Sequence, residues 1–260
     1  MNKIIFLSLI VASLLAHAKI IETDSFECIF NAVDQDTLVI FDIDNTLART
    51  ETEFGSDEWF SHLVSQKMME GYDYFSAIYL VLPLAYYAQF HLPLQLTDPI
   101  LVPLFRHLKT EHINSIGLTS RGLYLAERTY EQLKNIGIIF VIDHLYKNEF
   151  ILQPLSHPCL YKYHIIFCGN NNKGEALLLF LSTINYYPKK IIFIDDKMSH
   201  VRAVEQALQT TTIEYFGIRY TGCDHHVHNF DPAKAESQLH TIKESNNITT
   251  AALNLFLDNN

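Results

Sequence analysis

Two carboxylates, Asp42 and Asp44, directly follow an apolar stretch and are the first residues in the chain whose types and spacing could do chemistry. If the chain stays extended there, both side chains point to the same side. Paired carboxylates repel each other unless a cation neutralises them, and a hard ion such as Mg²⁺ suits them. One could also act as a nucleophile and form an aspartyl-phosphate, while the other protonates the leaving oxygen and then activates water.

Three more polar groups stand where an apolar stretch ends or a helical pattern begins: Thr119 with Ser120 and Arg121, Lys173, and Asp195 with Asp196. In parallel α/β sheets, ligands bind beyond the carboxyl ends of the strands. Because Asp42, Thr119 and Asp195 all end apolar stretches, we expect these distant groups to converge at one edge of a sheet.

Short apolar stretches rich in β-branched residues alternate with helical patterns, which predicts a parallel α/β sheet with right-handed crossovers. Strands are predicted over 37–41, 115–118, 138–141, 191–194 and 211–216, and a β-hairpin over 150–155 and 163–168. Helical patterns dominate 48–110 and recur over 126–136, 174–183 and 201–208.

Together and in this order, the groups of Asp42, Thr119, Lys173 and Asp195 resemble the four sequence motifs of the haloacid dehalogenase (HAD) superfamily. The resemblance implies a HAD-like Rossmannoid parallel sheet flanked by helices. It divides the chain into a core of 19–47 and 111–245, a helical cap insert of 48–110 and a small second insert of about 142–168. Ser120 and Arg121, with Arg128, Thr129 and Leu133 in the helix predicted to follow, also look like the secreted class C acid phosphatases. Asp195-Asp196-Lys197, however, stands where those usually carry Gly-Asp-Asn. Two further segments, Gly55-Ser56-Asp57-Glu58-Trp59-Phe60 and Tyr215-Phe216-Gly217-Ile218-Arg219-Tyr220, make the chain resemble more closely an exported Gram-negative family of unknown function.

The same resemblance implies a role for each motif residue. Asp42 would be the nucleophile and a metal ligand, and Asp44 would be the general acid/base, with its backbone carbonyl on the metal. Asp196 would bind the metal directly, and Asp195 would bind it directly or through water. Thr119 would donate a hydrogen bond to the phosphoryl group, Lys173 would balance the charge of Asp42 and phosphate, and Ser120 and Arg121 would bind substrate. The implied cofactor is Mg²⁺. The carboxylate of Asp44 favours phosphoryl transfer over dehalogenation, because only an ester releases an alkoxide that needs a proton.

These features favour a Mg²⁺-dependent phosphatase that hydrolyses an unidentified small-molecule phosphomonoester. Two alternatives stay open: a phosphotransferase or phosphomutase with the same nucleophile, and a secreted binding or host-interaction module on the same fold. The balance of 19 Lys+Arg against 29 Asp+Glu gives a net charge of −10, which argues against nucleic acid as a partner. No feature identifies a host or bacterial protein partner.

Residues 1–18 combine Lys3, an apolar run and a small-residue ending at Ala18, which predicts a signal peptide and export to the periplasm or beyond. We expect no stable membrane span after its removal, because Pro83 and polar residues interrupt the apolar stretch 74–94. The tail 246–260 is predicted to be flexible.

The four cysteines Cys28, Cys159, Cys168 and Cys223 could form one or two disulfides in an oxidising compartment or remain buried thiols, and the sequence does not choose. Cys223, His225, His226 and His228 have side chains that bind metals, but their spacing matches no familiar zinc finger. A polar surface loop is the favoured interpretation.

Overall fold

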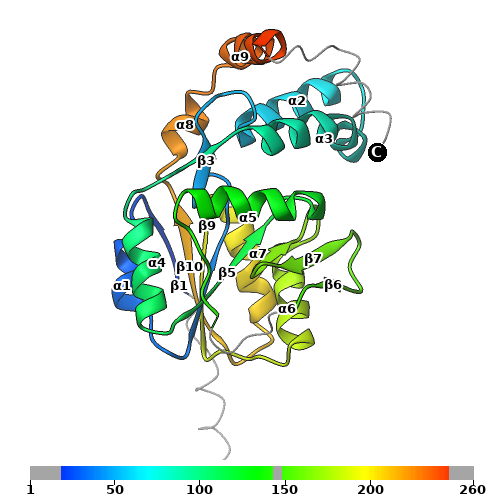
Figure 1. The fold of residues 1–260 in the computed structure, drawn as a ribbon. Coiled ribbons are helices and arrows are strands. Elements are labelled where there is room, and N and C mark those ends of the chain that lie inside the picture. Colours follow the sequence, from blue (N-terminus) through cyan, green and yellow to red (C-terminus); the bar gives the residue numbers. More distant parts are fainter. Residues whose placement is uncertain (1–18, 143–147, 246–260) are drawn as a thin grey trace, which may run out of the picture.

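The computed structural model describes residues 19–142 and 148–245, so the predicted signal peptide and tail lie outside it. Its centre is an eight-stranded sheet in the order β1-β10-β9-β2-β5-β8-β7-β6 (Figure 1). These strands are β1 (Lys19–Thr23), β2 (Thr37–Phe41), β5 (Asn114–Thr119), β6 (Phe150–Leu152), β7 (Cys159–Lys162), β8 (Ile165–Phe167), β9 (Lys190–Asp195) and β10 (Glu214–Tyr220).

The pairing is parallel from β1 through β8 and antiparallel only from β8 to β7 and β6. The predicted fold class, a mostly parallel α/β sheet flanked by helices, is therefore confirmed. The three short strands β6, β7 and β8 extend the sheet within the segment predicted as the small insert.

Helices cover both faces of the sheet, which explains why β2 is apolar at every position after Thr37. Val39 and Phe41 face one hydrophobic core, and Leu38 and Ile40 face the other. The first core includes residues of α1 (Glu27–Ala32), α4 (Leu101–Thr110) and α5 (Ala126–Asn135), which follows the short 3₁₀ helix η1 (Leu123–Leu125). The second includes α6 (Lys173–Thr183) and α7 (Met198–Leu208). A strand buried on both faces cannot alternate polar and apolar residues.

A close approach of α6 and α7 depends on Gly174. A Cβ at this position would lie 2.3 Å from the carbonyl oxygen of Ala203 in α7. The glycine therefore lets α6 pack directly against the backbone of its neighbour, and this contact fixes the start of the helix that carries Lys173.

A second layer of helices stands over one end of the sheet (Figure 1). It contains α2 (Asp57–Met69), α3 (Tyr74–His91) and α9 (Pro232–Ser245), hereafter the helical layer. The short antiparallel strands β3 (Ala48–Thr50) and β4 (Leu94–Leu96) lead into and out of α2 and α3, and α8 (Asp224–His228) precedes α9. Polar side chains cap α2 and α3: Ser56 accepts a hydrogen bond from the backbone of α2, and Asp73 from that of α3.

Two helices, α4 and α9, pack with different parts of the molecule than their neighbours in the chain do. α4 belongs to the segment 48–110, yet its apolar side chains Leu101, Leu104 and Leu108 lie in the core beneath the sheet. α9 belongs to the segment 111–245, yet its Ala235 and Leu239 pack with α2 and α3. α4 therefore packs with the sheet, and α9 packs with the helical layer.

The strand predicted over 138–141 is wrong. These residues are mostly buried but make only an irregular contact with β5: the backbone N–H of Ser115 donates to Val141, and the N–H of Val141 donates to the Ser115 hydroxyl. The other half of β5 pairs with β8. The predicted hairpin is also different, because β7 lies between the two predicted strands and pairs with both.

The residues with metal-binding side chains near Cys223 do not assemble a site within the described part of the chain. Cys223 is buried beneath the start of α8, whereas His225, His226 and His228 are exposed on it. All four cysteines are free thiols in the structure. Between residues 19 and 142 and between 148 and 245, no helix has the length and apolar character that crossing a membrane requires.

Candidate active site

Asp42 stands at the carboxyl end of the central strand β2. Its backbone N–H still donates to Ile194 of β9, at 2.9 Å, so the sheet fixes its position. The chain then turns sharply through Asn45, whose φ of +56° lies in the left-handed region. Asp42 is only 5% exposed, which places a carboxylate where it needs a charged partner.

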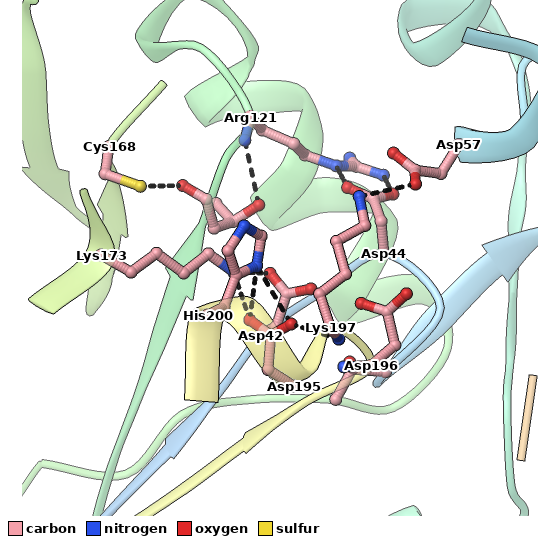
Figure 2. A network of polar contacts seen from close by, with 12 residues as sticks. Asp42, Asp44, Asp57, Arg121, Cys168, Lys173, Asp195, Asp196, Lys197 and His200 are labelled. Atoms are coloured by element: carbon pink, nitrogen blue, oxygen red, sulfur yellow. Dashed lines mark hydrogen bonds and ion pairs between the residues drawn. The ribbon is translucent and has the colours of Figure 1, made fainter. Parts of the chain in front are cut away.

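That partner is Lys173, the first residue of α6. Its Nζ donates to Asp42 at 2.6 Å and to Asp195 at 2.7 Å, and the residue is 2% exposed (Figure 2). Asn172 caps the helix by accepting from the backbone N–H groups of Gly174 and Glu175. Burial alone would lower the pKa of Lys173, but the two carboxylates raise it, so the ammonium stays charged.

Asp195 and Asp196 complete an acidic cluster at the end of β9. Asp195 is fully buried between Lys173 and His200, whose Nδ1 lies 3.1 Å from both of its carboxylate oxygens. Burial alone would raise the pKa of Asp195, but Lys173 and His200 lower it to about 2. For Asp196, burial together with the charges of Asp42 and Asp195 raises the pKa to about 9, although Lys197 opposes this.

The cluster fits a hard divalent cation. Asp42, Asp195 and Asp196 each offer a carboxylate oxygen, and these oxygens lie within 4.8 Å of one another. Asp195 also accepts from the backbone N–H of Lys197, so protein donors already surround it. Asp42 and Asp196 are thus the carboxylates with room to bind Mg²⁺ directly, with Asp195 behind them. Burial, together with the charges of neighbouring carboxylates, raises the pKa values of Asp42 and Asp196, and a bound cation would relieve the repulsion between these groups.

Asp44 is held by Arg121 in a bidentate pair, with Nε to Oδ2 at 2.8 Å and Nη2 to Oδ1 at 2.7 Å. Burial alone would raise the pKa of Asp44, but the guanidinium lowers it. Arg121 itself is 5% exposed, and its Nη1 donates to Thr129 and Gln132 of α5. Four of the five N–H groups of the Arg121 guanidinium donate to these protein acceptors, and its role in substrate binding stays a prediction.

Gln132 links this pair to the helical layer. Its Nε2 donates to the carbonyl oxygens of Gln89 and Leu92 at the end of α3, while its Oε1 accepts from Arg121. A continuous chain of hydrogen bonds thus runs from the carboxylate of Asp44 to α3. No role in the site was predicted for Gln132 or Thr129, because nothing in the pattern of an amphipathic helix shows which polar residue points inward.

Thr119 ends β5 and lies 1% exposed at the floor of the site. Its hydroxyl accepts from the backbone N–H of Arg121, and its carbonyl accepts from the backbone and thiol of Cys168. The Thr119 hydroxyl can still donate its own proton to a ligand. The neighbouring Ser120 is exposed and lines the same cleft.

The predicted site residues meet in a cleft of about 440 Å³ between the sheet and the helical layer. Its lining includes Asp42, Asp44, Thr119, Ser120, Arg121 and Asp196. Lys173 and Asp195 do not line it; Lys173 contacts the lining residue Asp42 and bridges it to Asp195, and Figure 2 shows these side chains close together. The helical layer adds apolar residues of α2 and α3 on the other side.

Two polar contacts tie the start of α2 to this floor. Lys197 Nζ lies 2.8 Å from a carboxylate oxygen of Asp57, and the Asn45 amide donates to Glu58 at 2.7 Å. Lys197 and Asp57 also line the cleft. The sequence did not assign roles to them, although Lys197 marks the departure from the class C acid phosphatase pattern.

The sequence profile of a family described as "Protein of unknown function (DUF2608)" matches residues 22–251. A "Putative outer membrane protein" of Chlamydia pneumoniae is 38% identical over 73 residues, 28% of this chain and 28% of that protein. An uncharacterized protein of Rickettsia prowazekii is 24% identical over 227 residues, 84% of this chain and 80% of that protein. A "Putative outer membrane protein" of Chlamydia trachomatis is 24% identical over 193 residues, 74% and 72% of the two chains.

Among solved structures, one titled as a putative beta-phosphoglucomutase from Thermotoga maritima aligns with a TM-score of 0.36 and 13% identity. The alignment covers 74% of this chain and 99% of that one.

Proposed function

The chain belongs to the DUF2608 family, whose function is unknown, and we propose that it is a Mg²⁺-dependent phosphomonoesterase that works through an aspartyl-phosphate. One observation carries the proposal: the buried carboxylate of Asp42 stands at a strand end between the ammonium of Lys173 and a second carboxylate, Asp196, and faces an open cleft. A carboxylate held in this way is a nucleophile for a group whose negative charge the same site neutralises.

In the first step, a carboxylate oxygen of Asp42 forms a bond to phosphorus, and the bond from phosphorus to the ester oxygen breaks. Asp44 gives its proton to that oxygen, and the alcohol leaves. In the second step, the Asp44 carboxylate takes a proton from water, whose oxygen attacks the phosphorus of the aspartyl-phosphate. Inorganic phosphate leaves, and Asp42 is regenerated.

The other residues of the site neutralise the charge of the phosphoryl group and position it. Lys173 balances Asp42 and the phosphoryl oxygens, and the Thr119 hydroxyl donates to one of those oxygens. Mg²⁺ bound by Asp42 and Asp196 would neutralise charge that develops on the transferred group. Arg121 keeps Asp44 ionised in the resting site, so Asp44 must take up a proton before it can act as an acid.

We also propose membership of the HAD superfamily and export from the cell. The order of the four motifs and their convergence on one cleft support the first. The pattern of residues 1–18 supports the second, together with relatives that carry the name outer membrane protein. Resemblance to the class C acid phosphatases is weaker, because Asp195-Asp196-Lys197 departs from their motif.

The test is hydrolysis of an aryl phosphate by the purified protein at pH 5 to 8, with Mg²⁺ or with chelator. Asp42→Asn removes the nucleophile with almost no change in shape. Asp36→Asn is the matched control, because Asp36 is an exposed carboxylate next to the opposite end of the same strand. A glycerol acceptor in a parallel reaction reports transfer instead of hydrolysis.

We expect Mg²⁺-dependent turnover that Asp42→Asn reduces by at least about 10³-fold and Asp36→Asn leaves unchanged. Mass spectrometry of acid-quenched enzyme should show phosphate on the peptide that contains Asp42. Turnover that survives Asp42→Asn would refute the nucleophile. Absence of turnover on a broad set of phosphomonoesters, in folded protein that binds Mg²⁺, would favour the binding-module alternative.

A further inference from the structure

The helical layer presents an apolar surface to the cleft. The side chains that contribute to it are Phe60 of α2 and Tyr74, Phe75, Ile78, Leu82 and Tyr86 of α3. α3 contains no Asp, Glu, Lys or Arg in its 18 residues, so it offers no ionic partner to a substrate. Aromatic and aliphatic side chains of this kind hold an apolar group by excluding water from it.

The basic side chains that line the cleft already have carboxylate partners. Arg121 is paired with Asp44, Lys197 with Asp57, and His200 lies against Asp195. The lining also carries the carboxylates of Asp42, Asp44, Asp57 and Asp196. A second anionic group on the substrate, beyond the phosphate at the metal, would therefore find no basic side chain without a carboxylate partner among the described lining residues.

The apolar surface reaches close to the place where phosphate would bind. Tyr86 packs on Gly122, three residues after Thr119, and a Cβ at Gly122 would lie 2.2 Å from the tyrosine hydroxyl. The glycine thus lets α3 approach the floor of the site. The alcohol of a phosphoester held at Asp42 and Thr119 would emerge against this surface.

The cleft is also larger than a phosphate ion requires. Its volume of about 440 Å³ lies in the range of sites that enclose an organic molecule of moderate size. Resting on the phosphomonoesterase function proposed above, we propose that the substrate is the phosphate monoester of an uncharged, apolar alcohol, whose aromatic ring or alkyl chain packs against α3.

The test compares esters of primary alcohols, so that leaving-group basicity is similar throughout. 2-Naphthylmethyl phosphate represents an aromatic source and n-octyl phosphate an aliphatic one, while glucose 6-phosphate is polar and 3-phosphoglycerate carries a second anion. Phe75→Ser alters the cleft with little risk to folding, because Phe75 is 62% exposed. Tyr79→Ser is the matched control: Tyr79 is 70% exposed on the same helix and does not line the cleft.

We expect kcat/KM for at least one of the two apolar esters to exceed that for glucose 6-phosphate by about tenfold or more, with 3-phosphoglycerate poorest. Whichever of the two is preferred identifies the ring or the chain. Phe75→Ser should lower kcat/KM for the preferred ester by about tenfold and leave glucose 6-phosphate within about twofold. Tyr79→Ser should change neither. Equal or faster turnover of the sugar phosphate, or an equal loss on every ester in Phe75→Ser, would overturn the inference while leaving the phosphatase function intact.

If no ester is hydrolysed, the proposed chemistry fails, and binding decides the substrate class separately. The naphthylmethyl and octyl phosphonates and the phosphonate analogue of glucose 6-phosphate can be titrated calorimetrically with Mg²⁺ present. At least one apolar phosphonate should bind about tenfold more tightly than the phosphonate analogue of glucose 6-phosphate. Phe75→Ser should remove this difference in affinity. Equal affinities for the three phosphonates would refute the inference on their own.

Discussion

The ionised carboxylate of Asp42 should destabilise the folded protein when no metal is bound. The difference in the free energy of unfolding between Asp42→Asn and wild type measures this effect. Burial, together with the charges of Asp195 and Asp44, raises the pKa of Asp42 from 3.8 to about 6, although Lys173 opposes this. At about 1.4 kcal/mol for each pH unit, ionising Asp42 in the folded protein costs about 3 kcal/mol of the free energy of unfolding. The amide of the Asp42→Asn variant has no proton to lose and avoids this cost.

The sign and the pH window follow from the two pKa values. Below pH 3.8, Asp42 is protonated in both the folded and the unfolded chain and costs nothing. Between pH 3.8 and about 6 the unfolded chain releases its proton first, so the stability of the wild-type protein falls. Above about pH 6 the loss is complete. The stability of Asp42→Asn relative to wild type should therefore rise by about 3 kcal/mol between about pH 4 and pH 7.

The assay is urea unfolding in chelator at pH 4 to 7, followed by circular dichroism and by the fluorescence of Trp59, the single tryptophan, which is buried in the helical layer. Asp36→Asn controls for the loss of a carboxylate elsewhere. Mg²⁺ at about 100 times its Kd should stabilise the wild-type protein by about 2.7 kcal/mol and Asp42→Asn by much less. The difference in stability between variant and wild type at pH 7 should therefore become smaller when Mg²⁺ is added. A stability difference that changes by less than about 1 kcal/mol across this pH range would refute the electrostatic reasoning.

Two further substitutions test the supports of the site. Lys173→Met leaves the carboxylates of Asp42 and Asp195 buried without their cation, so the free energy of unfolding at pH 7 in chelator should fall by about 3–5 kcal/mol, and a loss below about 1 kcal/mol would contradict the assigned pairing. Gln132→Leu removes the hydrogen bonds that join Arg121 to α3, so the free energy of unfolding should fall by about 1–3 kcal/mol. Amide hydrogen exchange at the end of α3 should become faster, and unchanged exchange rates there would argue against this connection.

The pairing of Arg121 shows why a site residue can be located from sequence while its partner cannot. A guanidinium after a strand end binds phosphate and carboxylate equally well. Which one it meets depends on the packing of α5, where Thr129 and Gln132 hold Nη1 so that Nε and Nη2 face Asp44. That choice is made by residues from separate elements.

The sequence by itself determined the features that depend on neighbouring residues. Each of these features depends on a short segment of the chain, because strand burial and helix capping act over a few residues. They are the apolar strand β2 that ends before Asp42, the cap at Asn172 that starts the helix of Lys173, and the strand that ends at Asp195. The parallel sheet then brings these ends together, since parallel strands share one carboxyl edge.

The tertiary structure alone decided which segments compete for the same neighbour. β8 pairs with the carboxyl half of β5, whereas residues 138–141 form no strand, and α9 packs against α2 and α3 although it lies far along the chain. It also decided that Lys197 pairs with Asp57 and leaves the cleft without an unpaired lysine among its described lining residues. Such contacts join residues far apart in the chain, and their energies depend on the burial and charge of all the groups that meet there.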